Sequence, residues 1–272
     1  MTWVSEIDPA ERIIGDGTKL TLGERPREGY EARDYKAEPL GYYAPPLGAS
    51  ERIDRAEFYD RAQELERGRA RLSDFASPRM AVLNQGRTNY CWINAVVFGA
   101  ELTRIRQGSD HVRLSPASGG AKIKNFRNVG GWCDQAAKFM QSRGIVPAEL
   151  WPQNEINRRY DTEQAWDVAK RYQLTEWNEL RPKNLDDLFS CLLRGLACPA
   201  GFSWWRHAVC LVDVVVFDKP RNTSDRELLR CFGVRFANSW GKSYGAQGYG
   251  ILKGSKQLAD GQLCIRSMRV TA

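Results

Sequence analysis

Cys91 is the residue of this chain whose neighbours best suit nucleophilic chemistry. It stands in the stretch NQGRTNYCWINA, six residues after Gln85, and apolar residues at helical spacing follow it. A thiol in the first turn of a helix meets unpaired backbone N–H groups and the positive end of the helix dipole, which favour the reactive thiolate. The stretch therefore indicates a nucleophile, with a buried structural thiol as the alternative.

A thiolate nucleophile needs an imidazole as its partner, and the chain holds only two histidines. His207 begins the apolar run HAVCLVDVVVF, which predicts a buried strand with the ring at its rim. His111 lies in the polar segment GSDHVRLSP, where an exposed loop residue is the simpler interpretation. His207 is the preferred base, although a structural histidine explains the position better when it is considered alone.

Two amide side chains could complete the set of groups that acyl transfer through cysteine requires. Asn238, in FANSWGKSYGAQGYGIL, could orient the imidazole. The side-chain amide of Gln85 and the backbone N–H of Cys91 could together hold an oxyanion. Taken one at a time, Asn238 is better explained by an ordinary turn, and Gln85 by a surface position.

The elements that must position these residues come as helices first and strands second. A polar arm rich in Gly and Pro leads into a charged amphipathic helix predicted for 51–73. Further helices are predicted for 91–107, 131–143, 161–172 and 184–194. Apolar β-rich runs separated by Gly, Asn and charged turns fill the last third. This order predicts an α+β fold with two packed halves.

Composition excludes several classes of protein. No apolar run reaches the length of a membrane helix and the N-terminus has no signal-peptide pattern, which predicts a cytoplasmic protein without a membrane partner. The net charge of +7 comes from basic residues scattered among acids, so specific nucleic-acid binding is not predicted. Seven cysteines without a close pair predict reduced thiols, and with only two histidines neither a metal site nor another cofactor is predicted.

The cysteine, histidine and asparagine segments, in this order, resemble the signature blocks of the papain-like cysteine peptidases. NQGRTNYCWINA is similar to that family's NQGxCGSCWAFSA, HAV to its histidine block, and NSWGKSYGAQGYGIL to its NSWGxxWGxxGY. LSP at 114–116 and VGGW at 129–132 are similar to its LSEQ and CNGG region. The resemblance covers roughly residues 76–272 in sparse blocks.

The resemblance implies a papain-like two-lobe fold. A helical left lobe of about 76–180 would carry Cys91, and an antiparallel, β-barrel-like right lobe of about 181–272 would carry the other catalytic groups. An N-terminal extension over 1–75 would precede this peptidase domain. The extension matches no prosegment pattern, so it could inhibit the site, dock the protein to a larger assembly, or simply pack on the lobes.

The resemblance also implies catalytic roles. Cys91 would be the nucleophile and His207 the general acid and base. Asn238 would orient the imidazole, with Trp240 shielding their hydrogen bond from water. Gln85 would complete the oxyanion hole.

Substrate-binding roles follow from the same resemblance. Gly130 and Gly131 would line the cleft and pair with the substrate backbone as an added strand does. Trp205 and Arg206, directly before the histidine, would form a bulky, cationic wall near the primary specificity pocket.

Several positions depart from the family pattern. Thr88 and Asn128 replace the two cysteines of the family's left-lobe disulfide, which agrees with a reducing compartment. Tyr244 replaces the second tryptophan of the asparagine block. The connection over 219–230 is longer than usual, and an exposed hairpin is predicted there.

These observations favour a thiol peptidase that hydrolyses peptide or amide bonds through a Cys91 thioester, with a peptide or protein as substrate. One alternative is a binding or structural protein on a papain-like scaffold, for example a virion-associated phage or bacterial protein. Another is a Cys-His acyltransferase that passes the acyl group to an amine.

Overall fold

The structure, a computed structural model, describes residues 51–76 and 80–269 of the 272-residue chain. The predicted polar arm over 1–50, with its candidate inhibitory or docking role, lies outside these residues. The helices are α1 (Phe58–Arg67), α2 (Leu72–Ala76), α3 (Cys91–Arg106), α4 (Pro116–Ile123), α5 (Cys133–Arg143), α6 (Glu163–Ala169), α7 (Leu185–Leu193) and α8 (Asp225–Cys231). Short 3₁₀ helices are η3 (Arg55–Glu57), η4 (Arg158–Tyr160), η5 (Lys170–Tyr172) and η6 (Gly254–Gln257). The strands are β1 (Leu174–Leu180), β2 (Cys198–Phe202), β3 (His207–Val216), β4 (Phe232–Ala237), β5 (Tyr249–Lys253) and β6 (Gly261–Met268).

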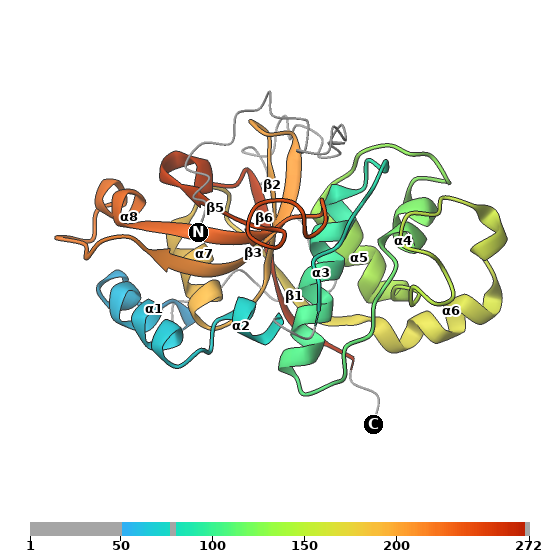
Figure 1. The fold of residues 1–272 in the computed structure, drawn as a ribbon, viewed down its shortest axis with the longest axis horizontal. Coiled ribbons are helices and arrows are strands. Elements are labelled where there is room, and N and C mark those ends of the chain that lie inside the picture. Colours follow the sequence, from blue (N-terminus) through green and yellow to red (C-terminus); the bar gives the residue numbers. More distant parts are fainter. Residues whose placement is uncertain (1–50, 77–79, 270–272) are drawn as a thin grey trace, which may run out of the picture.

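The strands form one antiparallel sheet in the order β1-β6-β2-β3-β4-β5. In Figure 1 this sheet lies with α1, α7 and α8 on one side of the molecule, which we call the β lobe. The other side, the helical lobe, contains α3 to α6. The predicted α+β architecture with two lobes is confirmed. The sheet itself is not closed, because β1 and β5 stand at its two ends with four strands between them, so the β lobe is an open sheet and not a barrel.

Helix α3 is the element that joins the two lobes. It packs against β3, β6 and β2 on one side and against α5 and α4 on the other. Its residues from Cys91 to Ile105 are all buried, as expected for a helix that is apolar around most of its circumference. Figure 1 shows that the Cys91 end of α3 and the turn between β2 and β3 lie at the same end of the molecule, toward the top of the view.

The predicted helices of the helical lobe and of α7 agree with the structure to within a few residues. The helix expected over 91–107 is α3, and that expected over 131–143 begins two residues later as α5. The segment 161–172 forms α6 followed by η5. Asn184 caps α7 as predicted, because its side chain accepts a hydrogen bond from the backbone N–H of Asp187 at 2.9 Å.

The helix predicted over 51–73 is divided into η3, α1 and α2. The break falls at Gly68 and Arg69, and Arg69 has a left-handed backbone with φ of 52°. This conformation cannot continue an α-helix, so the chain turns before Leu72 begins α2. Phe58 and Ala62, from the predicted apolar stripe, are buried in the core of the β lobe.

Residues before α1 are tied to the β lobe by polar contacts. Arg52 Nε lies 3.1 Å from the fully buried carboxylate of Asp187. The backbone N–H of Ile53 donates to Ser190 Oγ at 3.0 Å, and Arg55 pairs with Asp186. Residues 51–67 therefore pack as part of the β lobe, whereas α2 packs against both α3 and β3. The domain boundary near residue 75 stays a prediction.

Replacing Phe58 by alanine should destabilise the protein by about 3–5 kcal/mol. The ring is fully buried and meets Phe189 of α7 edge-on at a centroid distance of 5.4 Å, so its loss leaves a cavity between α1 and α7. Urea unfolding measures the change. The exposed Glu57→Ala variant is the control, and its effect should stay within about 1 kcal/mol because it removes only a surface ion pair with Arg61.

The exposed hairpin predicted over 219–230 is wrong. The segment instead enters α8, whose N-cap is Ser224, with the Ser224 side chain accepting from the backbone N–H of Glu227. Ser224 and Glu227 have the three-residue spacing of a capping pair. Arg230 adds ion pairs with Glu227 and Asp218, so local capping and charge pairing favour a helix over a strand.

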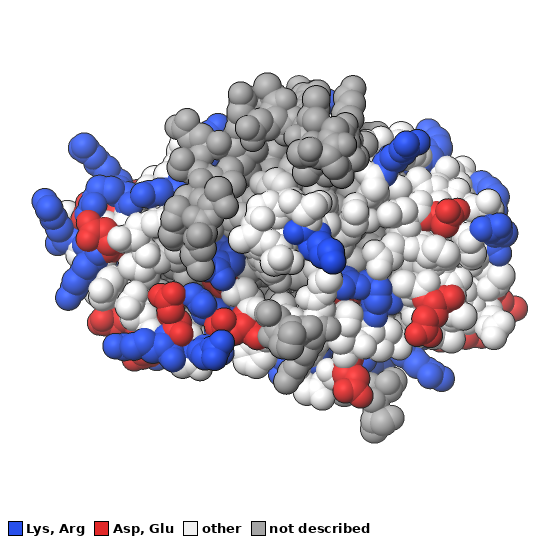
Figure 2. Space-filling model, viewed as in Figure 1, with Lys and Arg blue, Asp and Glu red and all other residues white. Residues whose placement is uncertain are grey.

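Charged residues are distributed as the sequence indicates. Figure 2 shows Lys and Arg interleaved with Asp and Glu on the face in view, most densely at the end of the β lobe that holds α1 and α8. Of the helices that the structure describes, none is long and apolar enough to cross a bilayer.

Candidate active site

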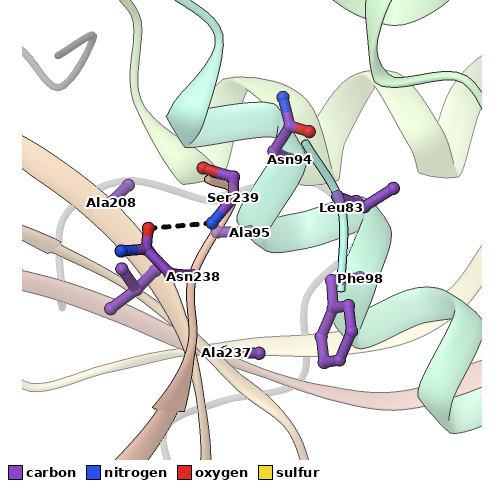
Figure 3. A pocket seen from close by; sticks show the side chains of 9 residues that line it. Leu83, Asn94, Ala95, Phe98, Ala208, Ala237, Asn238 and Ser239 are labelled. Carbon is purple, nitrogen blue, oxygen red and sulfur yellow. Dashed lines mark hydrogen bonds between the residues drawn. The ribbon is translucent and has the colours of Figure 1, made fainter. Parts of the chain in front are cut away.

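His207 and Asn238 are joined by a short hydrogen bond between the start of β3 and the residue after β4. His207 Nε2 lies 2.8 Å from Asn238 Oδ1, and both residues are buried. Asn238 Oδ1 also accepts the backbone N–H of Ser239 at 2.8 Å, drawn as the dashed line in Figure 3. Because this oxygen can only accept, His207 Nε2 must carry the hydrogen of the shared bond. The neutral ring then keeps its lone pair on Nδ1, where a general base needs it.

Aromatic rings enclose the imidazole of His207. Trp240 stacks on it with a centroid distance of 4.4 Å and an interplanar angle of 24°, and Trp205 meets it edge-on at 4.8 Å. His207 Nδ1 is buried and has no hydrogen-bond partner within the described residues. Burial lowers the pKa of His207 to about 4, and the hydrogen bond with Asn238 opposes this shift. The ring is therefore neutral at pH 7 unless a negative charge lies beside it.

Cys91 is the first residue of α3 and is fully buried. Ala95, one turn further along the same face of α3, lines a narrow pocket together with Ala208, which follows His207, and Asn238. Figure 3 shows these residues converging from α3 and from the strands. The first turn of the cysteine helix is thus packed against the start of the histidine strand and against the asparagine.

Gln85 connects the loop before α3 to the asparagine segment. Its side chain is fully buried, and its Oε1 accepts from Ser239 Oγ at 2.5 Å. Its backbone N–H donates to the carbonyl of Ser239 at 2.8 Å, and its Nε2 donates to the carbonyl of Thr88 at 2.7 Å. The amide is held at both its oxygen and its nitrogen. Ser239 makes both contacts with Gln85. The sequence did not indicate this role, because a serine next to a candidate asparagine is common.

Hydrogen bonds connect the two segments that a disulfide joins in the family that the sequence resembles. Asn128 Oδ1 accepts the backbone N–H of Asn89 at 2.6 Å, and its carbonyl accepts from Asn89 Nδ2 at 3.1 Å. Asn128 Nδ2 donates to the carbonyl of Arg87 at 3.0 Å. Asn128 is thereby attached to the residues on both sides of Thr88. Hydrogen bonds of Asn128 therefore hold the loop before α3 in place, and no disulfide is needed at these two positions.

Gly131 closely approaches Trp92, the residue after Cys91. A Cβ atom at Gly131 would lie 2.7 Å from Cε2 and 2.8 Å from Cδ2 of the Trp92 indole. Gly130 is half-buried beside it. Only a glycine lets this segment pass the indole, which places the predicted cleft-lining pair next to the start of α3.

For the peptide hydrolysis predicted from the sequence, the Gly131→Ala variant should lower kcat/KM by about 10- to 100-fold, because the indole next to the predicted nucleophile must shift. Overpacking should also cost about 1–3 kcal/mol of stability. Steady-state kinetics and thermal unfolding measure the two effects. Gly68→Ala, where the nearest atom lies 3.2 Å from the new Cβ and the backbone is right-handed, should leave kcat/KM unchanged. Equal kcat/KM for Gly131→Ala and the unaltered chain would remove the glycine from the site.

Trp205 and Arg206 form the turn between β2 and β3. The backbone N–H groups of both residues bond to carbonyls three residues earlier, and Arg206 adopts a left-handed φ of 55°. The turn directs Trp205 inward, where it is 3% exposed, while Arg206 is exposed. Trp204 stacks on Trp205 at 5.5 Å.

His111 takes part in a different cluster. Its Nε2 lies 3.1 Å from the buried carboxylate of Glu101, which also pairs with Arg113 and accepts the backbone N–H of Leu114. The histidine is half-buried, so the exposed loop position expected from the sequence is not observed. Glu101 lies ten residues beyond Cys91 on α3, so at about 1.5 Å per residue His111 is too distant to serve it.

All seven cysteines are thiols in this structure and all are buried. Burial raises the pKa of Cys198 and Cys210, as it does for thiols that act as small apolar core residues. Among the residues that the structure describes, no group of His, Cys, Asp and Glu is arranged to hold a metal ion.

Solved structures of cysteine proteases resemble this chain over most of its length. Xylellain, a cysteine protease from Xylella fastidiosa, has a TM-score of 0.59 and 18% identity and covers 91% of this chain and 96% of its own. The structure of digestive procathepsin L 3 from Tenebrio molitor larval midgut has a TM-score of 0.55 and 14% identity, with 86% and 96% covered. The chain has the papain-like fold.

The bromelain protease from Ananas comosus, solved in complex with the E64 inhibitor, has a TM-score of 0.54 and 17% identity and covers 71% of this chain and 95% of its own. No protein-family model and no curated protein matches the sequence. At these identities the similarity establishes the papain-like fold alone, so the chemistry must be argued from the residues of this chain.

Proposed function

We propose that this papain-like chain is a thiol peptidase that hydrolyses peptide bonds through a Cys91 acyl-enzyme. The observation that carries the proposal is the hydrogen bond from His207 Nε2 to Asn238 beneath Trp240, which leaves the buried Nδ1 atom as the base. Cys91, at the start of α3, is the nucleophile that this base serves.

The first half of the reaction forms a thioester. The Cys91 thiolate attacks the carbonyl carbon of the substrate amide, and the negative charge moves to the carbonyl oxygen. Nε2–H of Gln85 and the backbone N–H of Cys91 stabilise that oxyanion. His207, protonated on Nδ1, gives this proton to the leaving nitrogen as the C–N bond breaks, so the amine departs neutral.

The second half releases the acid. Neutral His207 takes a proton from water through Nδ1, and the hydroxide attacks the thioester carbonyl. The C–S bond breaks, the carboxylic acid leaves, and the thiolate and imidazolium are restored together. Asn238 keeps the Nε2–H tautomer throughout, and Trp240 and Trp205 exclude water from that hydrogen bond.

Digestion of fluorescently labelled casein by the full-length protein tests the proposal. The unaltered chain should release peptides, and Cys91→Ala should release none above background. Cys231→Ala, at the end of α8, is the matched control and should retain the activity. Digestion by Cys91→Ala at the rate of the unaltered chain would refute the assignment. Incorporation of an added amine without hydrolysis would instead support an acyltransferase. We propose a peptide or protein as the substrate and the cytoplasm as its setting.

A further inference from the structure

The three segments that build the candidate site contain cations and no acids. They are residues 82–91, 203–209 and 236–250, and they hold Arg87, Arg206 and Lys242. All 33 acidic residues of the chain lie outside them. Each of the three cations is within two residues of a group in the site: Arg87 follows Gln85, Arg206 precedes His207, and Lys242 follows Trp240. The charge carried by these three segments is therefore one-sided, although Asp260, from outside them, accepts the backbone N–H of Ser203 at 2.7 Å.

The side chains of Arg87, Arg206 and Lys242 are all exposed, and none has an ion pair among the described residues. Arginines elsewhere in the chain, such as Arg181 beside Asp187, are neutralised by carboxylates at 2.8–3.1 Å. A cation without a partner keeps its full attraction for a charged ligand, particularly next to buried apolar rings.

Backbone pairing joins the segments that carry Arg87 and Lys242. The backbone N–H of Gln85 donates to the carbonyl of Ser239, and that of Gly241 donates to the carbonyl of Leu83. The two segments therefore run side by side in antiparallel sense, with Arg87 and Lys242 at opposite ends of the paired stretch and Lys242 beyond Trp240. Arg206 joins them from the β2–β3 turn, because the ring of the next residue, His207, stacks on Trp240.

We infer that Arg206 and Lys242 select substrates with an acidic side chain in the first two residues on the leaving-group side of the cleaved amide. The inference rests on the proposed peptidase function. His207 must donate its proton to the leaving nitrogen, so the residues that follow this nitrogen pass His207 and its neighbours. A carboxylate there meets a cation that has no ion pair within residues 51–76 and 80–269, whereas a lysine would be repelled.

A matched series of fluorogenic peptides tests the inference with the full-length protein. Mass spectrometry on peptides with randomised residues on both sides of the cleaved bond first identifies a bond that the protein cleaves. The peptides of the series share this bond and carry Glu, Gln or Lys in the two positions after it. We expect kcat/KM to be at least about fivefold higher for Glu than for Gln, and lower still for Lys. The ratio of Glu to Gln should decrease between 0.05 and 1 M salt, over which the screening length shrinks to about 3 Å.

The Arg206→Gln variant should reduce the Glu-to-Gln ratio toward one, and Lys242→Gln should reduce it in part. Arg171→Gln is the matched control and should keep the ratio. Arg171 is an exposed arginine of η5, whose Tyr172 packs on Arg104 in the last turn of α3, at the opposite end from Cys91. Equal rates for all three peptides, or a ratio unaffected by Arg206→Gln, would overturn the inference.

Labelling of Cys91 by a neutral epoxide inhibitor of the E64 class separates this inference from the proposed function. If Cys91 is labelled and the peptides are cleaved without a preference for Glu, the proposed peptidase function is supported and the inference about Arg206 and Lys242 is wrong. If neither labelling nor cleavage occurs, the proposed function itself has failed, and the inference fails with it. Inhibition by single-stranded DNA as strong as that by a Glu-containing product peptide would indicate that these cations bind nucleic acid. This result would also overturn the inference.

Discussion

Replacing His207 by alanine should lower kcat/KM for peptide hydrolysis by about 10⁴-fold. The residue is proposed as acid in one half of the reaction and as base in the other, and its loss also removes the counter-charge of the Cys91 thiolate. The ring is fully buried between Trp240 and Trp205, so the alanine variant also leaves a cavity. His207→Gln, which fills more of that space, should show the same loss of activity. Thermal unfolding of both variants separates lost chemistry from lost folding.

The other histidine provides the control. His111→Ala removes the hydrogen bond between His111 Nε2 and the buried carboxylate of Glu101, yet Arg113 and the backbone N–H of Leu114 still contact that carboxylate. We expect a modest loss of stability and an unchanged kcat/KM. A His207→Gln protein that is folded and hydrolyses peptides within tenfold of the unaltered chain would contradict the proposed mechanism.

Replacing Gln85 by alanine should lower kcat/KM by about 10²–10³-fold, the usual effect of removing one oxyanion donor. The amide nitrogen carries two hydrogens, one of which is donated to Thr88, and the proposal gives the other to the oxyanion. Alkylation of Cys91 by iodoacetamide forms no oxyanion, so its rate should change by no more than a few-fold. This contrast distinguishes a donor to the transition state from a residue that only supports the loop.

Two further variants sharpen the Gln85 prediction. Ser239→Ala removes the hydroxyl that holds Gln85 Oε1, and it should cause a smaller loss because the Thr88 contact remains. Gln107→Ala, at the opposite end of α3, loses contacts with Met268 and should leave hydrolysis unchanged. Parallel losses of hydrolysis and alkylation in Gln85→Ala would show that the residue acts only by holding the helix start in place.

Much of the fold follows from short-range signals in the sequence. The apolar circumference of α3, the Asn184 cap of α7 and the β-rich final third were enough to predict two lobes. The break at Arg69 was not predictable, because only the chain's turn toward α2 requires its left-handed backbone. Helix α8 was missed because its capping pair, Ser224 and Glu227, lies in a segment that also reads as a polar turn.

The candidate site was predictable only as a set of residue types in order. His207 contacts both Asn238 and Trp240 in the structure, and no pattern in the sequence indicated which imidazole nitrogen would bond to the asparagine. The hydrogen bonds of Ser239 with Gln85 and of Asn128 with the loop before α3 join residues 154 and 39 positions apart. Such contacts depend on the packing of the lobes and leave no local trace in the sequence.

The charge state of the Cys91–His207 pair is the central claim of the proposed mechanism. Burial, opposed in part by the hydrogen bond with Asn238, lowers the pKa of His207 to about 4, which favours a neutral ring. A thiolate beside Nδ1 would raise this pKa by stabilising the imidazolium. Burial and the thiolate therefore shift the pKa of His207 in opposite directions. Reactivity of the thiol as a function of pH reports which of them prevails.

The most direct measurement is the rate of Cys91 alkylation by limiting iodoacetamide between pH 5.5 and 9, followed by intact mass and peptide mapping. An imidazolium-paired thiolate should react at nearly the same rate from pH 6 to 9 and lose this low-pH reactivity in His207→Gln. The alkylation rate of Cys133, which begins α5, is the internal comparison, because it reports the effect of a helix start on a thiol without the proposed histidine partner. A Cys91 rate that rises about tenfold per pH unit up to an ordinary thiol pKa near 8.5, unaffected by His207→Gln, would contradict the account.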